Sequence, residues 1–117
     1  MKKLLIVDDE KDILKLYEKE FSEEGYQVML AQSGEEALRI AQTDDINLVI
    51  LDIKMKGKDG LETLGELRKN NKARPIILNS AYSTYKGDFQ SWLADAYVVK
   101  SPDLTSLKKR VKSLLNF

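Results

Sequence analysis

The sequence predicts an α/β domain built on a doubly wound, five-stranded parallel sheet with helices on both faces. Two observations lead to this fold class. Short apolar runs alternate along the chain with stretches of helical period, as in a succession of βαβ units. The runs are bounded by polar residues and are almost wholly apolar, which is typical of strands buried on both faces.

Five apolar runs predict the strands, and they are Lys3–Val7, Gln27–Ala31, Asn47–Leu51, Pro75–Leu78 and Ala96–Val99. After the first strand, Ile13, Tyr17 and Phe21 recur every four residues with charged residues between them. This spacing indicates a first helix with one apolar face. Gly25 supplies the stop signal for that helix.

Two capping motifs predict the starts of the next two helices. Ser33-Gly34-Glu35-Glu36 is a capping box, in which the serine and the glutamate satisfy each other's free amide groups. Asp59-Gly60-Leu61-Glu62 repeats the device. The apolar residues that follow are Ala37, Leu38 and Ala41 in the second helix, and Leu61, Leu64 and Leu67 in the third.

The last helix is predicted to start at Ser101-Pro102. Proline suits the first helical position, because a backbone N–H there would have no partner within the helix. Its apolar stripe is Leu104, Leu107, Val111 and Leu114. Between the last two strands, residues Ser83–Ala94 predict a short or mobile fourth helix, since Gly87 interrupts the pattern.

The composition of the 117-residue chain fits one domain, residues 1–117, and excludes several kinds of chemistry. Cysteine and histidine are both absent. Their absence rules out disulfides, thiol catalysis, the usual zinc sites, a Ser-His-Asp triad and a phosphohistidine. No apolar run is long enough for a signal peptide core or a membrane span, so we expect a cytoplasmic protein without membrane insertion.

Charge is balanced overall, with 19 basic and 19 acidic residues, but it is divided along the chain. Residues 1–62 hold nine basic and fifteen acidic residues, whereas 63–117 hold ten and four. A neutral total gives no reason to expect direct binding to nucleic acid. The basic residues Lys108, Lys109, Arg110 and Lys112 of the last helix fit either a solvated face or the docking of an acidic partner.

Charged residues follow three of the predicted strands. Asp8 and Asp9 follow the first strand, Asp52 follows the third and Lys100 follows the fifth. Because ligands of open parallel sheets bind at the carboxyl ends of the strands, we expect these side chains to meet. Crowded carboxylates repel one another, so the cluster favours a bound divalent cation such as Mg²⁺. Alternatively, Asp8 and Asp9 stabilise only the positive end of the next helix dipole.

The chain resembles the receiver domains of bacterial two-component response regulators. The resemblance covers essentially the whole chain and rests on four motifs in the expected order. They are Val7-Asp8-Asp9-Glu10, the segment from Leu51-Asp52 to Asp59-Gly60, Asn79-Ser80-Ala81-Tyr82, and the segment from Ala94 to Lys100. The resemblance implies a flavodoxin-like strand order of 2-1-3-4-5.

The resemblance also implies a role for each site residue. Asp52 would accept a phosphoryl group from a histidine kinase or a histidine phosphotransfer protein, with Mg²⁺, or Mn²⁺, as cofactor. Asp9 would bind the cation directly and Asp8 through water, while Asp52 and the backbone carbonyl of Lys54 would complete the protein ligands. Lys100 would pair with a phosphoryl oxygen. Ser80 and Tyr97 would form the switch, with Ala81 small enough to leave the movement free, and a downstream protein would read the face made by the fourth helix, the fifth strand and the last helix.

Three positions depart from the usual pattern of the family, which has proline at Lys56 and Ser101 and threonine at Ser80. Serine keeps the hydroxyl group, so the switch is expected to survive. Two large residues, Lys54 and Tyr82, would flank the path by which water reaches the phosphoryl group. Because hydrolysis needs an open in-line approach, we expect slow self-dephosphorylation.

Two rival interpretations fit the sequence less well. Phosphatases of the haloacid dehalogenase class also phosphorylate an aspartate after an apolar strand, but they place a second acid two residues later, where this chain has Lys54. A receiver-like interaction module that works without phosphate would be marked by the loss of an acid, the hydroxyl group or the lysine. None of these is lost, so we expect a signalling switch rather than a metabolic enzyme.

Overall fold

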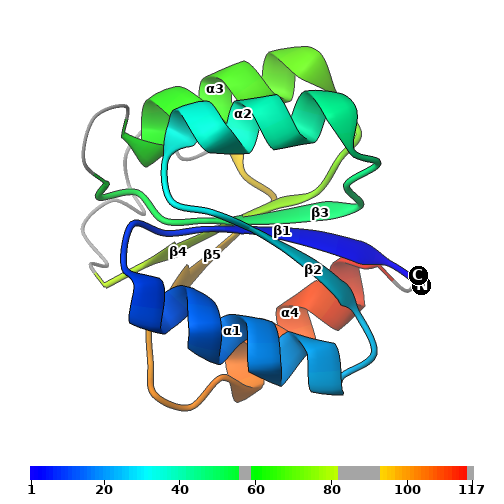
Figure 1. Cartoon of the computed structure of the whole chain (residues 1–117), viewed down its shortest axis with the longest axis vertical. Coiled ribbons are helices and arrows are strands. Elements are labelled where there is room, and N and C mark those ends of the chain that lie inside the picture. Colours follow the sequence, from blue (N-terminus) through cyan, green and yellow to red (C-terminus); the bar gives the residue numbers. More distant parts are fainter. Residues whose placement is uncertain (56–58, 82–92, 116–117) are drawn as a thin grey trace.

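The computed structural model describes residues 1–55, 59–81 and 93–115. In these residues a parallel sheet lies between two layers of helices (Figure 1). The strands are β1 (Lys3–Val7), β2 (Gln27–Ala31), β3 (Leu48–Leu51), β4 (Ile76–Ser80) and β5 (Ala96–Val99), and the helices are α1 (Lys11–Glu23), α2 (Gly34–Thr43), α3 (Gly60–Asn70) and α4 (Thr105–Leu115). The strand order β2-β1-β3-β4-β5 confirms the predicted fold class.

Alternation of side chains along the strands divides the interior into two cores. On β1, Leu5 and Val7 face the layer of α2 and α3, whereas Leu4 and Ile6 face the layer of α1 and α4 (Figure 1). All four side chains are almost completely buried. A strand with both faces covered must be apolar at successive positions, which explains the continuous apolar runs in the sequence.

The helix starts and stops follow the predicted signals, with one difference. Gly25 adopts φ 97° after α1, a conformation that glycine reaches without strain. At the start of α2 the Ser33 hydroxyl accepts from Glu36 N, as predicted, but the Glu36 carboxylate accepts from Gln32 N, one residue before the expected partner. At the start of α3 the Asp59 carboxylate accepts from Glu62 N at 2.9 Å.

Two predicted strand boundaries are corrected. β3 begins at Leu48, because Asn47 precedes the ladder and uses its side-chain oxygen to accept from Lys3 N. β4 runs over Ile76–Ser80 instead of Pro75–Leu78. Proline has no N–H to give, and the far end of β4 is extended because Ser80 lies opposite Val99 of β5.

The start of the last helix is also corrected. α4 begins at Thr105 rather than at Ser101-Pro102. The carboxylate of Asp103 accepts from both the backbone N–H and the hydroxyl of Thr105, and Asp103 N donates to the Ser101 hydroxyl. Short polar side chains that bond to nearby backbone favour a turn over a helix, so Pro102 lies in the turn and the helix starts after it.

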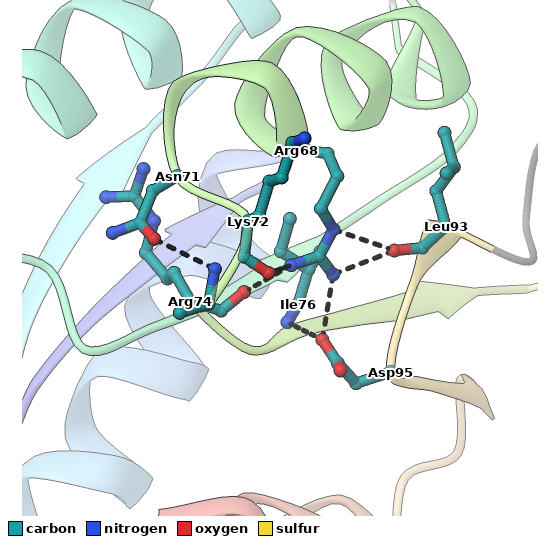
Figure 2. A network of polar contacts seen from close by, with 8 residues as sticks. Arg68, Asn71, Lys72, Arg74, Ile76, Leu93 and Asp95 are labelled. Carbon is teal, nitrogen blue, oxygen red and sulfur yellow. Dashed lines mark hydrogen bonds and ion pairs between the residues drawn. The ribbon is translucent and has the colours of Figure 1, made fainter.

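The junction between α3, β4 and β5 is held by the side chain of Arg68 (Figure 2). Its guanidinium group makes five hydrogen bonds of 2.7–3.0 Å, which matches its number of N–H donors. The acceptors are the backbone oxygens of Lys72, Arg74 and Leu93 and the carboxylate of Asp95. Asp95 also accepts from Ile76 N, so one network fixes the beginnings of β4 and β5 together.

The predicted fourth helix, Ser83–Ala94, lies outside the described residues except for its last two positions, as do Lys56 and Tyr82. No peptide bond among the described residues is cis, including the one between Lys100 and Ser101. Within the same ranges, no helix has the length and apolar character required to cross a membrane.

Candidate functional site

Two aspartates are buried where β1 and β3 end. Asp8 is 2% exposed and Asp52 is 5% exposed, although each directly follows a strand. The strands are paired so that Val7 lies opposite Leu51, and continuing this register by one residue places Asp8 beside Asp52. Buried carboxylates need compensating charge or hydrogen bonds, so partners for these two side chains are expected at this edge of the sheet.

Lys100 provides positive charge at this edge. Its ammonium nitrogen lies 2.7 Å from Asp8 Oδ2 and 3.4 Å from Asp52 Oδ2. Its backbone N–H donates to Ser80 O at 2.7 Å, which fixes the point from which the side chain reaches across the sheet. The structure therefore brings Asp8, Asp52 and Lys100 together, as expected from the sequence, with Asp8 as the closer partner of the lysine.

The electrostatic balance of the cluster is visible in two pKa shifts. Burial raises the pKa of Asp52 to about 6, with a further rise from Asp8, and the positive charge of Lys100 only partly opposes it. Burial alone would lower the pKa of Lys100, but its hydrogen bond to Asp8 and the charge of Asp52 outweigh burial and raise that pKa. At neutral pH the lysine is charged, and Asp52 is a carboxylate that burial destabilises.

A second feature of this edge is a group of acidic oxygens. Ligand atoms of Asp8, Asp9 and Glu10 all lie within 4.8 Å of one another. Asp8 turns one oxygen towards Glu10 N, at 2.9 Å, and the other towards Lys100. Oxygen ligands of this kind are those that Mg²⁺ prefers, so the donor set fits a hard divalent cation. Glu10 is an acidic neighbour that the sequence did not single out as a candidate ligand.

The backbone after Asp52 is in close contact with Gly60, the first residue of α3. A Cβ atom at Gly60 would lie 2.0 Å from Asp52 O and 2.5 Å from Ile53 Cα. Gly60 N also donates to Ile53 O at 2.7 Å. The absence of a side chain at this position therefore lets α3 support the segment that carries Asp52. In the sequence Gly60 was part of a capping motif and of the segment that resembles the receiver family, but its contact with Asp52 was not predicted.

The predicted switch residues lie on neighbouring strands. Ser80 ends β4 and is completely buried, and Tyr97 of β5 is partly buried. Tyr97 lies opposite Leu78, two residues before Ser80, so both side chains belong to the face covered by α2 and α3. Ala81, directly after Ser80, and Lys54, two residues after Asp52, are both exposed. Tyr82 lies outside the described residues, so its predicted position beside the site stays a prediction.

Asn79 and Tyr17 were placed in a family motif and on a helix face by the sequence, but neither was predicted as a site residue. Asn79 is 3% exposed and donates through Nδ2 to the hydroxyl of Tyr17, which is 2% exposed, at 2.8 Å. An amide within an otherwise apolar strand is the signal that could have drawn attention to this position.

Comparison with known proteins gives a consistent result. The family model of the response regulator receiver domain matches residues 4–112. The probable transcriptional regulator ycf27 of Cyanophora paradoxa is 42% identical over 120 residues, which cover 97% of this chain and 48% of that protein. The chain thus spans about half the length of the curated relatives that it matches.

Two solved structures match over their whole length. The response regulator protein TrrA of Thermotoga maritima, in complex with Mg²⁺ and BeF, is 51% identical with a TM-score of 0.96, covering 98% of this chain and 100% of that chain. TrrA in complex with the histidine kinase ThkA matches at 51% identity with a TM-score of 0.94, covering 99% of this chain and 100% of that chain.

Proposed function

The chain belongs to the response regulator receiver domains of two-component systems, and on this basis we propose that residues 1–117 form one phosphoacceptor domain. Its phosphoryl donor is a sensor histidine kinase or a histidine phosphotransfer protein, and its acceptor is Asp52. The complex between the similar TrrA and a histidine kinase supports this class of partner. The reaction changes the state of the protein itself, so the domain acts as a signalling switch.

The observation that carries this proposal is the buried Asp52 carboxylate with the Lys100 ammonium 3.4 Å away. A carboxylate oxygen of Asp52 attacks the phosphorus atom in line with the phosphorus–nitrogen bond of the donor. The new oxygen–phosphorus bond forms as the old bond breaks, and the donor imidazole keeps the electron pair. Lys100 then pairs with a phosphoryl oxygen, because its ammonium already lies beside the acceptor.

The acidic residues at the end of β1 fit the cation that this chemistry requires. Asp8, Asp9, Asp52 and the backbone carbonyl of Lys54 would hold Mg²⁺, with Mn²⁺ as a substitute. When bound, the cation neutralises charge on the phosphoryl oxygens and on the crowded carboxylates. The fit rests on the clustered acidic oxygens of Asp8, Asp9 and Glu10, and the complex of the similar TrrA with Mg²⁺ and BeF supports it.

The proposed switch links this chemistry to an output surface. Ser80 hydrogen-bonds the phosphoryl group once it is attached, and Tyr97 turns inward as the hydroxyl moves, with the small side chain of Ala81 leaving the path open. The two states are populated according to how well each one binds the phosphoryl group. The surface that changes comprises the predicted fourth helix, β5 and α4, and a downstream protein target reads it.

Two further proposals concern the cellular setting. The proposed site lies in the cytoplasm, where kinases of this class present their phosphohistidine. The domain signals through protein contacts, without binding nucleic acid or inserting into a membrane. The curated relative ycf27 is about twice as long as this chain, so this proposal concerns residues 1–117 alone.

Incubation with acetyl phosphate and Mg²⁺, followed by intact mass measurement, tests the proposal. The wild type is expected to gain one phosphoryl group, and Asp52→Ala is expected to gain none. A wild type that takes up no phosphoryl group, either from acetyl phosphate or from a phosphorylated histidine kinase, would instead support a receiver-like interaction module that works without phosphate.

A further inference from the structure

A buried pair of polar side chains connects α1 with β4 next to the proposed phosphorylation site. Asn79 Nδ2 donates to the Tyr17 hydroxyl at 2.8 Å, and the two residues are separated by 62 positions in the chain. They are 3% and 2% exposed. Burial of polar groups in an apolar core destabilises the folded protein unless the groups are hydrogen-bonded to each other. A buried polar pair at this position therefore suggests a functional role.

The register of the sheet places Asn79 beside the phosphoacceptor. Leu51 of β3 lies opposite Leu78 of β4, and the next residues along the two strands are Asp52 and Asn79. Alternation puts Asn79 on the same face as Ile77, which is the face covered by α1 and α4. Asp52 lies two residues after Ile50, which faces the same side, so alternation places Asp52 on that face too. Asn79 therefore lies in the same row of the sheet as the acidic cluster.

A continuous series of contacts runs from this pair to the lysine of the site. The residue after Asn79 is Ser80, whose carbonyl oxygen accepts from Lys100 N at 2.7 Å. The Lys100 ammonium in turn lies 2.7 Å from Asp8 and 3.4 Å from Asp52. A displacement at the end of β4 would thus move the backbone from which Lys100 reaches its partners.

Two hollows adjoin the pair, which is otherwise buried in the core between α1 and α4. A cavity of about 120 Å³ is lined by both Tyr17 and Asn79, and a hollow of about 270 Å³ is lined by both Tyr17 and Lys100. Tyr17 also packs within the core between α1 and α4, where its ring centroid lies 6.3 Å from that of Phe21. The hydrogen bond therefore adds to packing in fixing the amide and the phenol. Burial raises the pKa of Tyr17, and the charges of Lys100, Asp8 and Asp52 all act on its hydroxyl, which agrees with its place beside the cluster.

We propose that Tyr17 and Asn79 are positioning residues for phosphoryl transfer: their hydrogen bond holds the end of β4 against α1 and so fixes Lys100 relative to Asp52. This inference rests on the proposed function. It assigns the pair to the placement of the lysine, whereas the proposed cation ligands are Asp8, Asp9, Asp52 and the backbone carbonyl of Lys54. Neither Tyr17 nor Asn79 is among them.

Three variants separate positioning from simple stability. Tyr17→Phe and Asn79→Leu each leave one buried polar group unpaired, whereas the double variant removes both groups from the core. Unpaired burial is destabilising, but replacing both partners by apolar groups of similar shape is close to neutral. We therefore expect both single variants to be less stable than the wild type and the double variant to recover most of the loss.

The rate of phosphoryl transfer is expected to behave differently from stability. With acetyl phosphate as donor, the limiting rate falls about tenfold in all three variants, the double variant included, because the lysine is no longer held in place. The affinity for Mg²⁺, measured by calorimetry without donor, stays at the wild-type value.

Two results would overturn the inference while leaving the proposed function intact. One is a double variant that recovers the wild-type rate together with its stability, which would make the pair purely structural. The other is a loss of Mg²⁺ affinity in proportion to the loss of rate. A wild type that accepts no phosphoryl group in the same assay would instead refute the proposed function itself, and the inference with it.

Discussion

Replacing Gly60 by alanine tests how α3 supports the segment that carries Asp52. The added Cβ would lie 2.0 Å from Asp52 O, whereas ordinary contact begins at 3.4 Å. The helix start or the segment after Asp52 must therefore shift by about 1.4 Å, the difference between these two distances. Neither partner is a flexible side chain, and the shift strains the 2.7 Å hydrogen bond from Gly60 N to Ile53 O.

The expected magnitude follows from the packing. Forcing extra atoms into a packed region costs about 1–3 kcal/mol, and sometimes more. Gly65, in the same helix, is the matched control, because a Cβ there would meet nothing within 4 Å. Gly65→Ala should stabilise the protein by up to about 1 kcal/mol, since alanine favours the helix more than glycine does. The two glycine-to-alanine changes should thus have opposite signs.

Urea denaturation followed by circular dichroism measures the change in the free energy of unfolding. Intact mass after treatment with acetyl phosphate and Mg²⁺ measures the rate of phosphorylation. Gly60→Ala should slow phosphorylation by at least about tenfold, because displacement of a reacting group by about 1 Å is costly. Gly65→Ala should phosphorylate at the wild-type rate. Equal free energies of unfolding and equal rates for the two variants would show that the contact between Gly60 and Asp52 O does not exclude a side chain at position 60.

Three other predictions concern single side chains. In EDTA at pH 7, Asp52→Asn should be more stable than the wild type by about 3 kcal/mol, because burial raises the pKa of Asp52 from 3.8 to about 6. Folding then favours the protonated acid, so the wild type should lose stability as the pH rises from about 4 to about 6. In urea titrations at a series of pH values, the free energies of unfolding of the two proteins should converge below about pH 4. Arg68→Lys should lower the free energy of unfolding by about 2–3 kcal/mol, since lysine cannot repeat the five hydrogen bonds. The control is Arg39→Lys at an exposed position, which should change the free energy of unfolding by less than about 0.5 kcal/mol. Lys54→Asn should shorten the lifetime of the phosphorylated protein by opening the approach of water; an unchanged decay by intact mass would contradict the shielding role of Lys54.

Much of the fold was predictable because the local signals agree with the global arrangement. Strands such as Lys3–Val7 are covered on both faces, so nearly every position must be apolar and the run is easy to recognise. The charged residues that follow these runs were expected to meet because parallel strands end at one edge, and Asp8, Asp52 and Lys100 do meet there.

The features that were missed depend on contacts between distant residues. The start of α4 is set by side chains of Ser101 and Asp103 that compete with helix formation, whereas proline in the same segment suggested an earlier start. The need for glycine at position 60 arises from its contact with the backbone of Asp52. The pairing of Asn79 with Tyr17 joins residues that no periodic pattern connects.

The central claim, that Asp52 is the residue that receives the phosphoryl group, is tested most directly by trapping the product. Borohydride reduces an aspartyl phosphate to homoserine, and peptide mass spectrometry then identifies the modified position. After treatment with a phosphorylated histidine kinase and Mg²⁺, we expect homoserine at position 52 and unmodified aspartate at Asp8 and Asp9. Homoserine at either of those positions, with Asp52 unmodified, would contradict the claim.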